Sequence, residues 1–224
     1  MARRPAASTT PTRGAQLTRE RVLAAAIDLA DAEGLDGLSM RRLGAALAVD
    51  PMAIYRHVRD KDDLLDGMVD SIVARVPIAA GETWDAALRS TILGARAELL
   101  RHPWAKGVIE SRPTPGPATV QYIDRVLGIL RGGGASVELC HHALHVLGSR
   151  LMGFSQDLYD DATGTDNDPE LMALQFKRWA ATVPHVAELA MAASHDGGLG
   201  GCDDDAEFRF ALDLILEGLA RRIG

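Results

Sequence analysis

The sequence predicts an all-α protein, in which an N-terminal three-helix, helix-turn-helix domain is joined to a larger helical domain. Ala, Leu and Gly dominate the 224 residues, and aromatic residues make up only 4%. Ala and Leu favour helices, whereas strands prefer β-branched and aromatic side chains. Apolar residues also recur three and four positions apart, which is the period of an amphipathic helix. No apolar run approaches the ~20 residues that span a bilayer.

The first two helices are predicted from their capping residues. Thr18 stands in an N-cap position and Gly34 in the position after the last helical turn, so the first helix is expected within residues 17 to 34. Ser39 is a second N-cap, and a second helix is expected to continue from it to Leu47.

A short third helix is predicted over residues 51 to 57. Asp50 is an N-cap, and Pro51 occupies the first helical position, where its missing N–H costs nothing. Ile54 and Val58 lie four residues apart and are expected to face inward, because this spacing places them on one side of a helix.

The fourth helix is predicted to begin after Asp60 and to stop before Pro77. Asp60 is an N-cap, and Asp63 lies in the first turn, where a negative charge complements the helix dipole. The second and third helices, joined by a three- or four-residue turn, describe a helix-turn-helix, with the first and fourth helices as its apolar floor.

The rest of the chain is expected to be helical, with turns rich in Gly, Pro and Asp. The four prolines between residues 102 and 117 are expected to break any long helix there. The predicted helices cover 84–101, 117–131, 136 to about 159, 169–182, a shorter segment to about 194, and 206–222. The predicted organisation is a flexible arm at 1–16, a helix-turn-helix domain at 17–76 and a helical domain at 77–224.

The charge of the chain is unevenly distributed. Residues 1 to 61 hold ten Lys and Arg against seven Asp and Glu, a net charge of +3, and the remaining residues hold fourteen against twenty-four, a net charge of −10. This asymmetry indicates that only the N-terminal part meets a polyanion. Cys140 and Cys202 have no metal-ligand spacing, which suits a reducing cytoplasm.

Residues 17 to 73 resemble the DNA-binding domain of the tetracycline-repressor (TetR) family. The resemblance rests on Gly34, Leu38-Ser39-Met40-Arg41, Tyr55-Arg56-His57-Val58, and Lys61 with Leu64-Leu65. Residues 81 to 160 look like the C-terminal class of the tetracycline repressor proper. The resemblance implies a homodimeric transcriptional regulator, by family a repressor, that is cytoplasmic and has no cofactor. It is expected to bind a palindromic DNA operator and to be released from it by a small-molecule effector.

The third helix and its flanks are the predicted DNA-binding site, since the second helix of such a motif enters the major groove. Arg56 is the candidate for reading guanine, and Met52 or Ala53 for contacting a thymine methyl group. By family analogy, other side chains fix the register on the phosphate backbone. The predicted DNA contacts are Ser39, Arg41, Met52, Ala53, Tyr55, Arg56, His57 and Lys61. Three alternatives stay open. Tyr55 could be a rim aromatic that covers the core, and Arg42 could be a solvated charge. The N-terminal arm could contact the minor groove or be a disordered tail.

The resemblance also implies an effector site in the C-terminal domain. Pro77 and Val108 stand where the tetracycline repressor has its two magnesium-associated histidines, and neither can coordinate Mg²⁺, so a tetracycline–magnesium effector is not expected. A partly apolar molecule with a polar group is expected instead. Met152 and Phe154 could line its pocket or could equally be ordinary core residues. The candidate ligand-binding residues are Trp104, Val108, Ser111, Arg112, Tyr122, Met152, Phe154 and Asp157.

The last helix carries an apolar stripe that is predicted to form the dimer interface, as part of a four-helix bundle with the symmetry mate. The predicted interface residues are Phe208, Leu212, Ile215, Leu216 and Leu219. His141 and His145 have a spacing that can bind a metal, but no third ligand stands at a fitting offset, so packing or interface histidines are expected rather than a metal site.

Two other classes of protein fit the sequence less well. An enzyme requires a convergent nucleophile and base or paired carboxylates, whereas the acidic residues here gather in the loops 160–170 and 203–207, where solvation or capping explains them. A helical small-molecule-binding or interaction protein with weak, non-specific DNA binding is the alternative to the regulator. That alternative does not explain why positive charge concentrates in residues 1 to 61.

Overall fold

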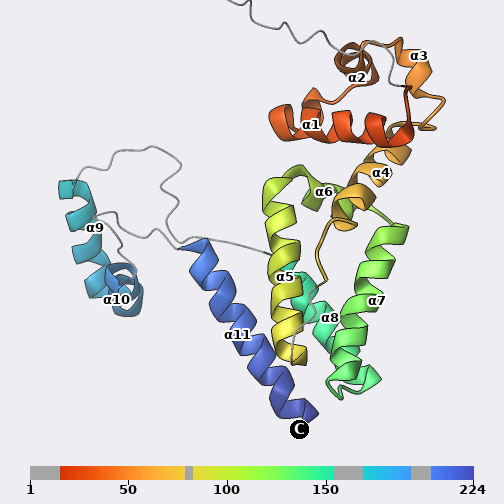
Figure 1. Cartoon of the computed structure of the whole chain (residues 1–224). Coiled ribbons are helices and arrows are strands. Elements are labelled where there is room, and N and C mark those ends of the chain that lie inside the picture. The colour runs from red at the N-terminus through yellow and green to blue at the C-terminus, as the bar shows by residue number, and fades with distance from the viewer. Residues whose placement is uncertain (1–15, 79–82, 154–168, 193–202) are drawn as a thin grey trace, which may run out of the picture. The chain divides into compact units, whose positions relative to one another are not determined.

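The computed structural model describes residues 16–78, 83–153, 169–192 and 203–224, and every regular element in these ranges is an α-helix, as the sequence predicted (Figure 1). None of these helices combines the length and apolar character that crossing a membrane requires. The predicted arm at 1–16 lies, apart from its last residue, outside the described residues. The helices are α1 Arg19–Gly37, α2 Met40–Leu47, α3 Pro51–Ile54, α4 Lys61–Val73, α5 Trp84–Arg101, α6 Trp104–Ser111, α7 Pro117–Gly132, α8 Val137–Met152, α9 Pro169–Thr182, α10 Pro184–Ala192 and α11 Asp204–Ile223.

The chain divides into two compact units. The first unit comprises residues 1–80 and 90–128, and the second comprises 81–89 and 129–224. The first unit therefore contains α1 to α4, α6 and parts of α5 and α7. These units differ from the predicted domains, which remain predictions.

The four predicted N-caps are confirmed. Each side chain accepts a hydrogen bond from a backbone N–H two or three residues later, which satisfies a donor that the first helical turn leaves open. These caps are Thr18, Ser39, Asp50 and Asp60. Gly34 adopts φ +70°, which interrupts the helical path near the end of α1 as its glycine predicted.

Two helices differ from the prediction. α3 ends at Ile54, and residues 55–57 form a turn closed by a hydrogen bond from His57 N to Ile54 O at 2.8 Å. α6 was not predicted, because the four nearby prolines suggested a loop, but all of them lie outside its interior, where proline does no harm.

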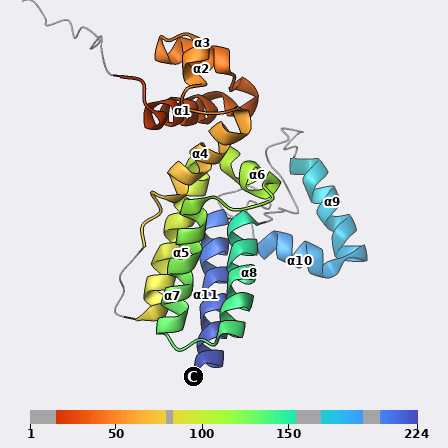
Figure 2. The same cartoon turned by 90° about the vertical axis from the view of Figure 1, so that its right-hand side faces the viewer.

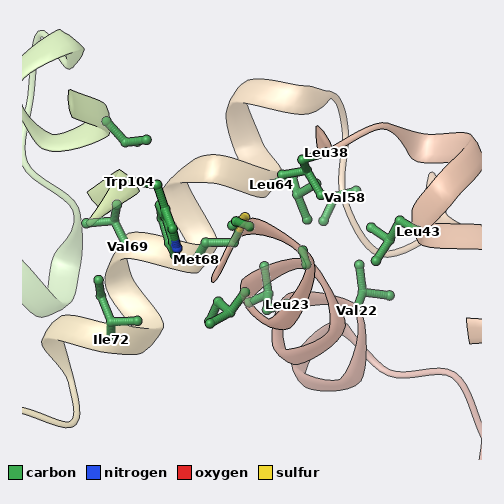
Figure 3. Close-up of a cluster of buried hydrophobic side chains, with 14 of the residues drawn as sticks. Val22, Leu23, Leu38, Leu43, Val58, Leu64, Met68, Val69, Ile72 and Trp104 are labelled. Carbon is green, nitrogen blue, oxygen red and sulfur yellow. The ribbon is translucent and has the colours of Figure 1, made fainter. Parts of the chain in front are cut away.

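The core of the first unit joins the helix-turn-helix to α6. Its sixteen buried residues come from α1 to α4, their connections and α6. Figure 3 shows Val69, Met68 and Trp104 toward one side of this cluster and Leu43 toward the other. Burying a large apolar side chain stabilises a fold by ~1.5–3 kcal/mol, so α6 stabilises the helix-turn-helix directly.

The second unit is built around α8 and α11, which pack side by side (Figure 2). Cys140, Ala143 and Leu147 of α8 are buried in this unit. From α11, the buried side chains are Phe208, Leu212, Leu216 and Leu219. Most of the predicted interface stripe is thus buried within the protomer, and its part in a dimer interface stays a prediction. α9 and α10 pack against each other.

Candidate nucleic-acid interface and ligand-binding residues

The segment from Asp50 to Val58 has buried side chains on one side and exposed side chains on the other. Ile54 and Val58 are buried, as predicted. Met52 and Tyr55 keep 71% and 44% of their surface exposed and are therefore open to an external partner. Of the other predicted DNA contacts, Ser39, Arg41, Arg56 and Lys61 are exposed, and Ala53 and His57 are half-buried.

Three cations near this segment are not used by the fold. Arg41, Arg56 and Lys61 make no ion pair or side-chain hydrogen bond with any residue in the ranges that the structure covers. Arg42, by contrast, pairs with Glu33. The unpaired cations remain available to an external anion, since phosphate contacts are the main source of affinity for DNA.

Arg19, which no motif in the sequence indicates, fixes the C-terminal end of the segment from Asp50 to Val58, hereafter called the recognition segment. Its guanidinium donates hydrogen bonds to the carbonyl oxygen of His57 at 2.6 Å and to both carboxylate oxygens of Asp63 at 2.9 and 3.2 Å. The same carboxylate accepts the backbone N–H of Arg59 at 2.8 Å. The hydrogen bond from Arg19 is the main cause that lowers the pKa of Asp63 to about 2. The turn after α3 is therefore tied to both α1 and α4.

Two of the predicted ligand-binding residues lie in the core of the first unit. Trp104, with 8% of its surface exposed, donates its indole N–H to Asp31 Oδ1 at 2.6 Å, and His102 Nδ1 lies 2.8 Å from the same oxygen. Val108 is buried with Trp104 among residues of α1 and α4. These contacts give both side chains a structural role, and ligand contact by either stays a prediction.

The other candidates from the ligand-binding set are spread over both units. Ser111 is exposed, and its hydroxyl donates to the carbonyl of Val108 at 2.9 Å, while Arg112 forms an ion pair with Asp66 of α4. Burial raises the pKa of Tyr122 to about 12. Met152 belongs to the second unit, and Phe154 and Asp157 lie outside the described residues.

A groove lies between α8 and α11 in the second unit. Its apolar lining includes Ile215 and Leu219, which belong to the predicted interface, and Leu214, which does not. The rings of His141 and His145 contact each other with centroids 4.6 Å apart. Within the part of the chain that the structure describes, no group of three or more His, Cys, Asp or Glu side chains has the arrangement of a metal site.

A buried anchor, an exposed short helix and unpaired cations around it define a helix-turn-helix DNA-binding protein. Comparison with protein families agrees: the family "Bacterial regulatory proteins, tetR family" matches residues 22–68, and "Tetracyclin repressor-like, C-terminal domain" matches residues 76–223. The chain belongs to the TetR family of transcriptional regulators, as the resemblance implied.

The relatives include repressors. The HTH-type transcriptional repressor DrrR1 of Streptomyces coeruleorubidus is 34% identical over 97% of this chain and 81% of its own length. The class D tetracycline repressor protein of Escherichia coli is 39% identical, over 44% of this chain and 48% of its own.

The similar solved structures include a regulator with bound small molecules. ActR of Streptomyces coelicolor in complex with actinorhodin has a TM-score of 0.72 and 26% identity, and covers 94% of this chain and 100% of its own. Its complex with (S)-DNPA has a TM-score of 0.71 and 27% identity, with the same coverage. TetR-family regulators thus bind DNA and small-molecule ligands.

Proposed function

We propose that this chain is a ligand-responsive repressor, which binds a palindromic operator as a homodimer and leaves the operator when a small-molecule effector binds. The observation that carries this proposal is the recognition segment, where Ile54 and Val58 are buried while Arg56 and Tyr55 are exposed. A core-building segment would not expose its largest side chains. The proposal places the protein in the cytoplasm, together with the DNA.

Within this proposal, Arg56 reads a base and the surrounding polar residues hold the phosphate backbone. The guanidinium of Arg56 matches the O6 and N7 acceptors of guanine. Arg41, Tyr55, His57 and Lys61 set the register, and Ser39 adds a contact at the N-terminus of α2. Met52 and Ala53 are assigned to a thymine methyl group.

The homodimer is proposed to form over the groove between α8 and α11. Leu214, Ile215 and Val146 line this groove, and Leu214 and Val146 are 52% and 49% exposed in the protomer. Apolar surface of this kind is covered in a twofold helix–helix interface. The interface is therefore centred on Ile215 and its exposed neighbours rather than on the whole predicted stripe.

A gel shift tests the function. The full-length protein is titrated onto DNA from upstream of its own gene and onto a shuffled duplex of equal length, at several salt concentrations. We expect preference for the upstream DNA and a steep fall in affinity with salt, as the release of counterions from phosphates requires. Equal, weak binding to both duplexes would support the alternative function, a helical small-molecule-binding or interaction protein with non-specific DNA affinity.

A further inference from the structure

Three histidines stand on α8, and two of them are paired at a spacing suited to chelation. His141 and His145 are four residues apart, so both side chains project from the same side of the helix. Their rings contact each other with centroids 4.6 Å apart and an angle of 73° between the ring planes. The ring of His142 lies farther from His141, with centroids 5.7 Å apart. The closest pair is therefore His141 and His145.

The fold does not use the ring nitrogens of this pair. Both side chains are exposed, so neither packs into the core of the protomer. In the part of the chain that the structure covers, the histidine rings that form hydrogen bonds or ion pairs belong to His102 and His185, and neither ring of the pair forms one. Two imidazoles with unused nitrogens thus stand side by side at the surface of a regular helix.

This arrangement has the chemistry of a metal chelate. Imidazole nitrogen is a preferred ligand of Zn²⁺, Ni²⁺ and Cu²⁺, and the Zn–N distance is about 2.0–2.1 Å. Two histidines four residues apart on one helix can bind the same ion, as they do in zinc sites of this spacing. Exposed rings are free to change rotamer, so both nitrogens can turn toward a shared ion without a change in the backbone. The second imidazole is held beside the first, which makes its binding step intramolecular and raises the affinity.

We propose that His141 and His145 form a binding site for a divalent transition metal ion that prefers nitrogen ligands, Zn²⁺, Ni²⁺ or Cu²⁺. Each histidine supplies one ring nitrogen. Water completes the coordination sphere, since the described residues contain no group of three or more His, Cys, Asp or Glu side chains that could hold a metal. A structural zinc site is closed by four protein ligands, so a site with two is suited to reversible binding.

The proposed site does not depend on the proposed function. α8 belongs to the second compact unit, whereas the predicted DNA contacts belong to the first. The groove assigned to the homodimer is lined by His142, but His141 and His145 are not part of its lining. Metal binding and operator binding can therefore succeed or fail separately.

Calorimetric titration of the full-length protein with NiCl₂, and separately with ZnCl₂, tests the site in a buffer that does not bind metals. We expect one Ni²⁺ per chain at this site. His141→Ala and His145→Ala are each expected to weaken binding about tenfold or more, because the remaining imidazole loses its intramolecular partner. Alanine has the highest helix propensity, so α8 is preserved in both variants. MgCl₂ is the control ion, since Mg²⁺ prefers oxygen ligands.

Two further variants separate the spacing of the pair from the number of histidines. His142→Ala removes the neighbouring histidine and is expected to keep the wild-type affinity for Ni²⁺. The double variant His145→Ala/Ser149→His keeps seven histidines but separates the two ligands by eight residues, about 12 Å along the helix. Ser149 is exposed, so the fold accepts this change. The double variant is expected to bind Ni²⁺ as weakly as His145→Ala.

Thermal unfolding supplies a second measurement, because an ion that binds only the folded chain raises the melting temperature. Ni²⁺ is expected to raise the melting temperature of the wild-type protein and of His142→Ala, but to leave that of His141→Ala almost unchanged. A pair of histidines that is merely solvated predicts no such difference. The inference is overturned if the wild-type protein binds neither Ni²⁺ nor Zn²⁺, if His141→Ala retains the wild-type affinity, or if the double variant binds as tightly as the wild type.

Discussion

Asp63 is the carboxylate whose protonation the structure ties most clearly to folding. Its pKa falls from 3.8 to about 2, first because of the hydrogen bond from Arg19. A carboxyl whose folded-state pKa is depressed stabilises the fold above its unfolded pKa, and this stabilisation is lost as pH falls toward the folded-state value. The contribution of Asp63 is therefore complete above pH 3.8 and declines between 3.8 and about 2.

We predict that Asp63→Asn lowers the free energy of unfolding at pH 7, and that its difference from the wild-type protein shrinks as pH falls below 4, where about half of an unperturbed carboxyl is protonated. Urea unfolding at pH 7, 5, 4 and 3 measures this difference. Asp62→Asn, one residue earlier and exposed, is the matched control. A difference that stays constant over this range would contradict the assignment to the Arg19–Asp63 contact.

Substitutions of Arg56 and Arg41 by alanine are predicted to change DNA binding in different ways. Arg56→Ala is expected to lose ~1–3 kcal/mol of discrimination at one position in each half-site, since a bidentate contact to guanine is removed. Arg41→Ala is expected to weaken all sequences alike and to reduce the salt dependence by about one phosphate contact. Affinities for a set of singly substituted operators distinguish the two. Uniform loss for Arg56→Ala would make it a phosphate contact instead.

α6 is held against α1 of the helix-turn-helix through Trp104, whose indole N–H donates to Asp31. We predict that Trp104→Phe destabilises the protein by about 2 kcal/mol or more, because the smaller phenyl ring loses the hydrogen bond to Asp31 and leaves part of the buried indole site empty. Thermal or urea unfolding measures the change. In a double-mutant cycle with Asp31→Ala, which removes the acceptor, the two substitutions should be non-additive, and strict additivity would show that the indole–carboxylate contact contributes nothing to stability.

Local sequence signals predict most of the helices, but they do not predict which side chains of different helices contact each other. Thr18 or Asp60 is recognisable as a cap because its partner lies only three residues away. Arg19 meets Asp63 across 44 residues, and no spacing rule connects them. The apolar stripe on α11 predicts a buried face, but periodicity does not say whether α8 of the same chain or a second copy covers it.

At the scale of the whole molecule, the proposed homodimer depends on the groove between α8 and α11. A charge placed in a buried helix–helix interface is strongly unfavourable, whereas the same charge on an exposed protomer surface is tolerated. Leu214 lines the groove and is 52% exposed in the protomer, so Leu214→Glu leaves the fold of each copy intact.

We therefore predict that Leu214→Glu is a folded monomer in sedimentation velocity and that it loses most of its affinity for a palindromic operator, while its affinity for an isolated half-site is unchanged. One copy engages only one of the two successive major grooves, so the operator and the half-site become equivalent for the monomer. Ala220→Glu, which adds the same charge to an exposed position of α11 outside the groove, should remain dimeric. A dimeric Leu214→Glu would move the interface away from this groove, and a monomer with undiminished operator affinity would show that dimerisation is not required for recognition.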